Sequence, residues 1–124
     1  MGAVEQMEIF PSITDDDKVA AKYLLQRYGR MIGIVRGLAK KKLLTEKECQ
    51  VYSEYSKKTE ALEMAVSLII DDNVRRVMEF RFIRGNSRWG TVKRFNFITD
   101  RSIDRRIVRG VESVAETLKL IGVI

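Results

Sequence analysis

Histidine is absent from this 124-residue sequence, and Cys49 is its single cysteine. Because zinc sites rely on His and Cys and a disulfide needs two thiols, the composition predicts neither feature. The sequence also has no Walker-type or paired-carboxylate motif, and no histidine that could serve a nucleophile as general base. We therefore expect a cytoplasmic protein that is not an enzyme, holds no metal and needs no cofactor.

Proline, glycine and long apolar runs are scarce as well. The chain has one proline and eight glycines, whereas 45% of its residues are hydrophobic and 32% are charged. This balance favours one soluble, mostly helical unit over a disordered or sheet-rich chain. The apolar run 31–35 ends at Arg36, far short of the roughly 20 residues that span a bilayer. The first residues do not resemble a signal peptide, so we expect no membrane segment.

Positive charge is abundant in one stretch. The net charge of the chain is +6, but residues 73–110 contain eleven Lys and Arg against three acidic residues, a local net charge of +8. A basic patch attracts polyanions because each phosphate that it neutralises releases counterions. Double-stranded DNA is therefore the first partner to consider, and an acidic protein is the alternative.

Two helices are predicted in the N-terminal half. Thr14 and the aspartates after it predict a helix from about residue 15 to 42, with Gly29 and Gly33 as weak points. Thr45 and Glu48 form a capping box for a second helix, which runs to about residue 70 with a break near 56–59. An antiparallel pair follows from the apolar positions Val19, Tyr23, Leu24, Met31, Val35 and Leu38 in the first helix and Val51, Tyr55, Leu62, Ala65 and Ile69 in the second.

Three further helices are predicted between residues 72 and 120. They cover residues 73–83, 88–96 and 100–120, with a glycine turn at 84–87 and Thr99 as the cap of the last helix. The inward face of the last helix consists of Ile103, Ile107, Val111, Val114 and Leu118. The sequence thus predicts an all-α fold, in which an N-terminal helical region (1–71) precedes a three-helix region (72–124).

A short helix, a turn and a longer helix with charged first turns are typical of a helix-turn-helix. Residues 72–112 resemble region 4 of the sigma-70 family, and among small proteins with this module the chain is similar to phage late-gene regulators of the ArpU and RinA types. The matching residues are Arg81, Phe82, Gly85, Trp89, Val92, Ile98, Thr99, Arg101, Ser102, Ile103 and Arg106. The sequence departs from the family at Lys93 and at residues 95–97, where a lengthened turn with Asn96 in the left-handed conformation fits best.

The resemblance implies a sequence-specific DNA-binding transcription regulator of a phage or prophage, an activator of packaging or lysis genes that acts in the cytoplasm of the bacterial host. The last helix would lie in the major groove, with base contacts from Asp100, Arg101, Ser102, Asp104 and Arg105. We expect phosphate contacts from Arg88, Lys93, Arg94, Arg106 and Arg109, with Arg75, Arg76 and Arg84 as further candidates. The N-terminal helices would serve oligomerisation, such as a homodimer, or contact with RNA polymerase.

Three alternatives stay open. The chain could be a phage small terminase subunit, or a helical interaction module that binds RNA polymerase without touching DNA. The basic helix could also be a solvated face whose arginines pair with Asp100, Asp104 and Glu112. We expect Trp89 and the phenylalanines 80, 82, 95 and 97 in the core, and the aspartates 15–17 at a helix cap rather than at a magnesium ion. The apolar residues 118–124 pack either on the molecule's own core or on a partner.

Overall fold

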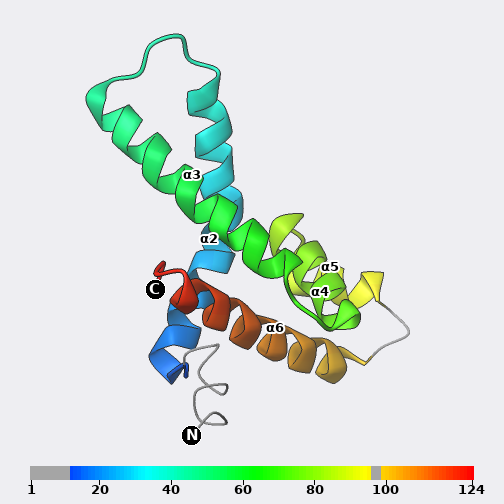
Figure 1. Cartoon of the computed structure of the whole chain (residues 1–124). Coiled ribbons are helices and arrows are strands. Elements are labelled where there is room, and N and C mark those ends of the chain that lie inside the picture. Colours follow the sequence, from blue (N-terminus) through cyan, green and yellow to red (C-terminus); the bar gives the residue numbers. More distant parts are fainter. Residues whose placement is uncertain (1–11, 96–98) are drawn as a thin grey trace, which may run out of the picture.

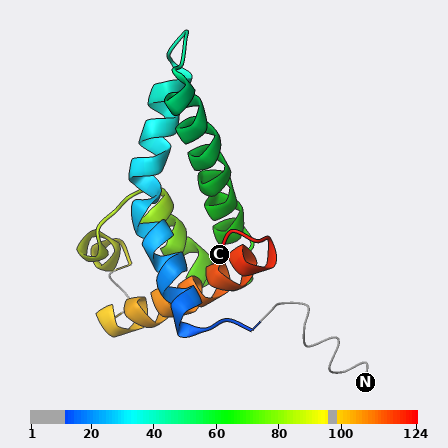
Figure 2. The same ribbon diagram turned by 90° about the vertical axis from the view of Figure 1, so that its left-hand side faces the viewer.

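The computed structural model describes residues 12–95 and 99–124, and all regular elements within them are helical (Figure 1). The prediction of an all-α fold is therefore confirmed. The long helices are α2 (Asp15–Ala39), α3 (Glu46–Ser67) and α6 (Asp100–Leu120). The short ones are α4 (Asp72–Met78), the π-helix η1 (Glu79–Ile83) and α5 (Arg88–Arg94). Helices α2 and α3 form an antiparallel hairpin that projects from the other helices, and α6 crosses its base (Figures 1 and 2).

Both helices of the hairpin begin at the threonines that the sequence predicts as caps, and each threonine takes part in a capping box. Thr14 accepts a hydrogen bond from the Asp17 backbone N–H (3.2 Å) and donates its own N–H to the Asp17 carboxylate (2.8 Å). Thr45 and Glu48 exchange the same two bonds at 3.1 and 2.9 Å. Each box satisfies two N–H groups that have no partner within the helix.

The structure differs from the predicted ends and interruptions of these helices in four places. Helix α2 ends at Ala39 rather than Lys42, because the chain turns at Lys40. Helix α3 ends at Ser67 and is continuous through 56–59, where the Thr59 hydroxyl donates to the Tyr55 carbonyl (2.8 Å) inside the helix. The glycines of α2 do not interrupt it, since tertiary packing outweighs their weak helix propensity.

The predicted apolar face of α2 is only partly correct. Its buried residues are Ala21, Leu25, Tyr28 and Met31. The side chains of Val19 and Tyr23, which we expected to face α3, are 67% and 51% exposed. Helix α2 packs against both α3 and α6. The residues that it buries therefore differ from those that would face α3 alone. The expected positions Leu62, Ala65 and Ile69 near the end of α3 are buried.

Helix α6 completes the main core. Val111, Val114 and Leu118 are buried in one cluster with residues of α2, α3 and α4, and Ile107 packs partly against it. The predicted inward face of this helix is confirmed. After Leu120 the chain reverses at Gly122 (φ +83°), and the Val123 N–H donates to the Leu118 carbonyl (2.8 Å). Val123 and Ile124 return to the molecule's own core, whereas Leu120 and Ile121 remain exposed.

The expected helix over 73–83 is an α-helix that continues as a π-helix. The Arg84 N–H donates to the Glu79 carbonyl (2.9 Å), five residues earlier, and Gly85 then turns the chain at φ +75°. Arg81 donates to the Asn86 carbonyl (2.8 Å), and the Asn86 amide donates to the Phe80 carbonyl (2.9 Å). These bonds hold the predicted turn 84–87 against η1.

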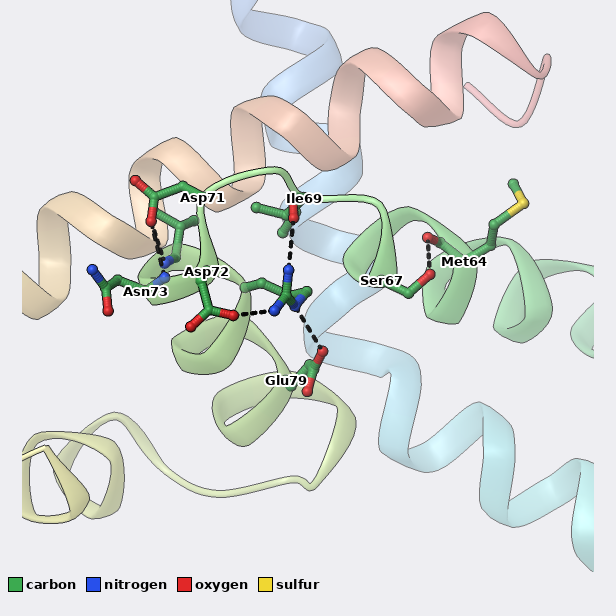
Figure 3. Close-up of polar contacts among 9 residues, drawn as sticks. Met64, Ser67, Ile69, Asp71, Asp72, Asn73 and Glu79 are labelled. Carbon is green, nitrogen blue, oxygen red and sulfur yellow. Dashed lines mark hydrogen bonds and ion pairs between the residues drawn. The ribbon is translucent and has the colours of Figure 1, made fainter.

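Figure 3 shows the junction between α3 and α4. The Asp71 carboxylate caps α4 by accepting from the N–H groups of Asn73 (2.9 Å) and Val74 (3.2 Å). Arg75 donates to the Ile69 carbonyl (3.3 Å) and pairs with Asp72 and Glu79. Its guanidinium therefore connects α4 to the segment that follows α3. Arg75 is consequently less available to bind a phosphate than we expected from the sequence.

Candidate nucleic-acid interface

The first half of α6 is buried against the protein on one face and exposed to solvent on the other. Thr99 caps the helix by accepting from the Ser102 N–H (3.2 Å). Ile103 is fully buried in a second apolar cluster with Val77 and Phe95. The ring of Phe80 meets that of Phe95 edge-on, with centroids 5.9 Å apart. This cluster fixes the orientation of α6, so the side chains on its outer face have a defined position.

Four arginines occupy that outer face, and we call them the arginine face: Arg101, Arg105, Arg106 and Arg109. Arg101, Arg105 and Arg109 are exposed, Arg106 is half-buried, and the last three line a shallow hollow together with Ser102. Within residues 12–95 and 99–124, no carboxylate lies within ion-pairing distance of any of the four. Their charges are therefore directed to solvent.

The acids that could have neutralised the arginine face bond elsewhere. Asp104 pairs with Arg88 of α5, Glu112 lies 3.5 Å from Lys18 of α2, and Asp100 accepts from the Arg101 backbone N–H (2.9 Å). The internal pairing that a plain solvated helix face would show is absent among these described side chains.

Asp104 and Arg88 form a two-point ion pair between α6 and α5. The Arg88 Nε and Nη2 atoms lie 2.9 and 2.8 Å from the two carboxylate oxygens of Asp104. The hydrogen bond from Arg88, assisted by the positive charges of Arg88 and Lys22, lowers the pKa of Asp104, and the same bond raises the pKa of Arg88. We expected Asp104 to contact bases and Arg88 to contact phosphate. The structure brings them together, so Asp104 is occupied in holding Arg88.

The two remaining expected phosphate contacts, Lys93 and Arg94, are exposed on α5. Arg94 does not line the hollow of the arginine face. It lies with Arg76 and Arg84 around a second hollow, whose wall includes Phe80 and Phe95, and its guanidinium is 5.7 Å from the Phe95 ring centroid. Arg94 therefore belongs to a second surface, where Glu79 accompanies the three arginines, and not to the arginine face.

Aromatic residues divide into buried and exposed ones. Phe82 and Phe95 are buried and Phe80 is partly buried, as expected, whereas Phe97 and Asn96 lie outside the described residues. The side chain of Trp89 is 59% exposed, so its assignment to the core is wrong. Helix α5 has only two turns and buries Thr91 instead, which leaves Trp89 beside Arg88 on the outside.

Helix α2 contributes cations that the sequence interpretation missed. Lys18 and Lys22 line a hollow with Ile107, Val108 and Glu112 of α6. These lysines precede the arginine face by about 80 residues, so no local pattern links them to it. Only the packing of α2 against α6 places the two lysines beside this hollow on α6.

The described residues give little support for a metal site or a membrane segment. Among the described residues, no three His, Cys, Asp or Glu side chains are grouped as a metal ion would require. Asp17 binds the Thr14 N–H and Lys119 Nζ (2.8 Å), and the bond from Lys119 is the main cause of its lowered pKa. None of the described helices has both the length and the apolar character needed to cross a bilayer.

Comparison with known proteins gives no match: no family model, no curated protein and no solved structure is significantly similar to this chain. The candidate interface is therefore defined by its own geometry.

Proposed function

We propose that this protein is a sequence-specific DNA-binding transcription regulator. Helices α5 and α6 act as a helix-turn-helix of the sigma-region-4 type, with the first half of α6 in the major groove. One observation carries the proposal: α6 presents four arginines that have no acidic partner among the described residues on its outer face, while Ile103 and Val111 bury the opposite face. A cationic, rigidly anchored helix is the requirement for entering a DNA groove.

The ion pair between α5 and α6 refines the expected roles. Arg101, Ser102 and Arg105 contact base edges, because they lie in the first two turns of α6. Arg106 and Arg109 follow along the helix and bind phosphates. Asp104 positions Arg88, whose remaining N–H groups point to the backbone beside the groove.

The resemblance to phage late-gene regulators supports a role as an activator of packaging or lysis genes. The projecting hairpin of α2 and α3 is then available for oligomerisation or for contact with RNA polymerase. Binding of RNA polymerase in the absence of any DNA binding would favour the interaction-module alternative, and a ring-sized particle would favour a small terminase subunit.

Substitution at the arginine face tests the proposal. Arg105→Ala should weaken binding to a selected duplex by about 1 to 3 kcal/mol and relax the preference at one base pair. Lys93→Ala should weaken binding to all duplexes alike and reduce the salt dependence by about one counterion. Fluorescence anisotropy with duplexes selected from a random library measures both effects.

Arg36→Ala is the matched control, because Arg36 is an exposed arginine on the hairpin, away from α6. It should bind DNA as the wild type does. The proposal is wrong if the wild type binds no duplex at moderate salt, or if Arg105→Ala and Lys93→Ala both retain full affinity.

A further inference from the structure

The outer half of the α2–α3 hairpin has no core of its own. From residue 32 to residue 58 no side chain is buried, whereas the inner halves of the same helices bury Leu25, Tyr28 and Leu62. Figures 1 and 2 show this outer half standing free of the other helices. It nevertheless contains the half-buried apolar or aromatic side chains Ile32, Ile34, Val35, Leu38, Val51, Tyr52 and Tyr55. Helices of this length gain most of their stability from packing. The apolar surface of this outer half lacks such packing within the molecule.

One face of the hairpin offers a groove for that partner. Leu24, Met31 and Ile34 of α2 and Tyr55 of α3 form its apolar part. Charged side chains lie at its edges: the exposed Arg27 and Arg30 on α2, and Glu54 with its ion-pair partner Lys58 on α3. An apolar centre with a charged rim is the usual anatomy of a protein interface.

The two helices of the hairpin carry opposite charge. Residues 27–42 contain six Lys and Arg and no acidic residue, whereas residues 46–63 contain five glutamates and three lysines. Within the described residues, Arg27, Arg30 and Arg36 have no acidic partner. Glu54 pairs with Lys58 of its own helix (2.9 Å), and Lys41 pairs with Glu48 at the tip (2.5 Å). The hairpin therefore has a cationic edge and an acidic edge side by side.

We propose that a second copy of this chain covers the groove, with α2 of each copy against α3 of the other in a four-helix bundle. In a two-fold dimer the same surface serves both partners, so it must be complementary to itself. A surface with one cationic and one acidic helix meets this condition when the two-fold axis runs parallel to the hairpin, because α2 of each copy then faces α3 of the other and both tips lie at the same end. Packing α2 on α2 would instead oppose two strongly cationic helices.

The size of the surface fits this partner. A standard protein interface uses about 20 to 30 residues on each side. Residues 23–58, which contain the groove and the coreless segment, number 36, so one face of the hairpin supplies about half of them, close to this number, and the half-buried apolar side chains on that face would become the centre of the bundle. The inference concerns the hairpin only and does not rest on DNA binding by α6.

Sedimentation equilibrium of the full chain tests the proposal with two Ile→Glu variants. Ile34→Glu places a charge in the groove, whereas Ile70→Glu places it at the α3–α4 junction, where Ile70 is 96% exposed. We expect a dimer for the wild type and for Ile70→Glu at tens of micromolar. Ile34→Glu should raise the dissociation constant by about tenfold or more. Equal helix content of the variants in circular dichroism excludes misfolding as the cause.

Charge reversal tests the pairing of α2 with α3. The double variant Arg27→Glu/Arg30→Glu and the variant Glu54→Arg should each dimerise more weakly than the wild type, since each brings like charges together. Mixing the two variants should restore a dimer that contains one copy of each, because each α2–α3 contact then joins opposite charges again. A two-fold contact between identical helices would instead leave each variant alone about as strong a dimer as the wild type, because like charges already oppose each other in all three.

A wild type that stays monomeric at several hundred micromolar would overturn the proposal, as would a dimer that Ile34→Glu leaves intact. Loss of DNA affinity in Arg27→Glu/Arg30→Glu with an unchanged oligomeric state would assign the cationic edge to nucleic acid instead. An intact, Ile34-dependent dimer that binds no DNA would contradict the proposed function and leave this inference standing.

Discussion

Gly110 is the residue at which α6 approaches α4 most closely. A Cβ added there would overlap the Cγ and Sδ atoms of Met78, which is fully buried. Gly110→Ala should therefore lower the free energy of unfolding, because the overpacking cost of about 1 to 3 kcal/mol exceeds the helix-propensity gain of about 1 kcal/mol. Urea denaturation measures the difference.

Gly29→Ala provides the matched control for Gly110→Ala. Nothing lies within 4 Å of a Cβ added at Gly29, so only the propensity gain remains and the variant should be more stable by about 0.5 to 1 kcal/mol. Equal effects of the two substitutions would contradict the close approach of α6 to α4.

Tyr28 links α2 to α3 through its hydroxyl, which donates to the Glu63 carboxylate. Burial and this hydrogen bond raise the pKa of Tyr28 from 10.0 to about 12. Because folding favours the protonated phenol, the stabilisation is complete below pH 10 and is lost as the pH rises toward 12. The free energy of unfolding, measured by urea denaturation at a series of pH values, should therefore fall between pH 10 and pH 12.

Tyr28→Phe is the control for the alkaline transition. It removes the titrating hydroxyl while keeping the ring, so its stability should depend less on pH between 10 and 12 than that of the wild type. An identical alkaline loss in both proteins would assign the effect to other groups.

Helices α5 and α6 are joined by the Arg88–Asp104 pair as well as by apolar contacts. The pKa of Asp104 is lowered from 3.8, so the pair is complete above that pH and is lost as the pH falls through the lower folded-state value. Near neutral pH the Arg88 Nε–H should therefore exchange with solvent more slowly in NMR spectra than that of an unpaired arginine at the same pH, and this protection should be lost in strong acid. In Asp104→Asn the protection should be absent at every pH.

Arg36 supplies the reference signal for this measurement, because it has no acidic partner within the described part of the chain. Its Nε–H should exchange at the rate of an unpaired arginine at each pH. If the Arg88 and Arg36 signals behave alike near neutral pH, the two helices are not held by this pair.

Helix boundaries show what sequence can predict about single elements. The starts of α2, α3 and α6 follow from Thr14, Thr45 and Thr99, whose side chains act within three residues of their own position. The π-helix η1 has no comparable local signal. It depends on how Phe82 packs into the core and how Arg81 bonds to the following turn.

The tertiary structure of the whole molecule is connected through α6, because this helix packs against α2, α3 and α4. A fragment of residues 72–124 would lose the partners of Val114, Ala115 and Leu118, which are buried in the shared core. We expect this fragment to show low helicity and no cooperative unfolding, since short helices without packing are marginal in water. The full chain should unfold in one transition, seen alike by circular dichroism and by fluorescence of its single tryptophan, Trp89.

A sharp thermal transition of the 72–124 fragment would contradict this expectation. It would instead favour the division at residue 71 that the sequence suggested, with a C-terminal region that folds alone. Different midpoints for the two probes in the full chain would favour that division as well.

Much about this protein is determined by its sequence alone. Composition selects a helical fold, threonine caps set where helices start, and the periodicity of Ile103, Val111 and Leu118 decides which side of α6 is buried. Local charge also identifies a basic helix. Each of these properties follows from the composition or from residues on the same helix, which the sequence lists directly.

The tertiary structure decided which side chains remain available to bind a partner. It paired Asp104 with Arg88, separated Arg94 from the arginine face, exposed Trp89 and brought Lys18 and Lys22 of α2 to α6. It also left the outer half of the hairpin without a core. These outcomes depend on contacts between residues 16 to about 90 positions apart, and the geometry of such contacts exists only after the helices have packed.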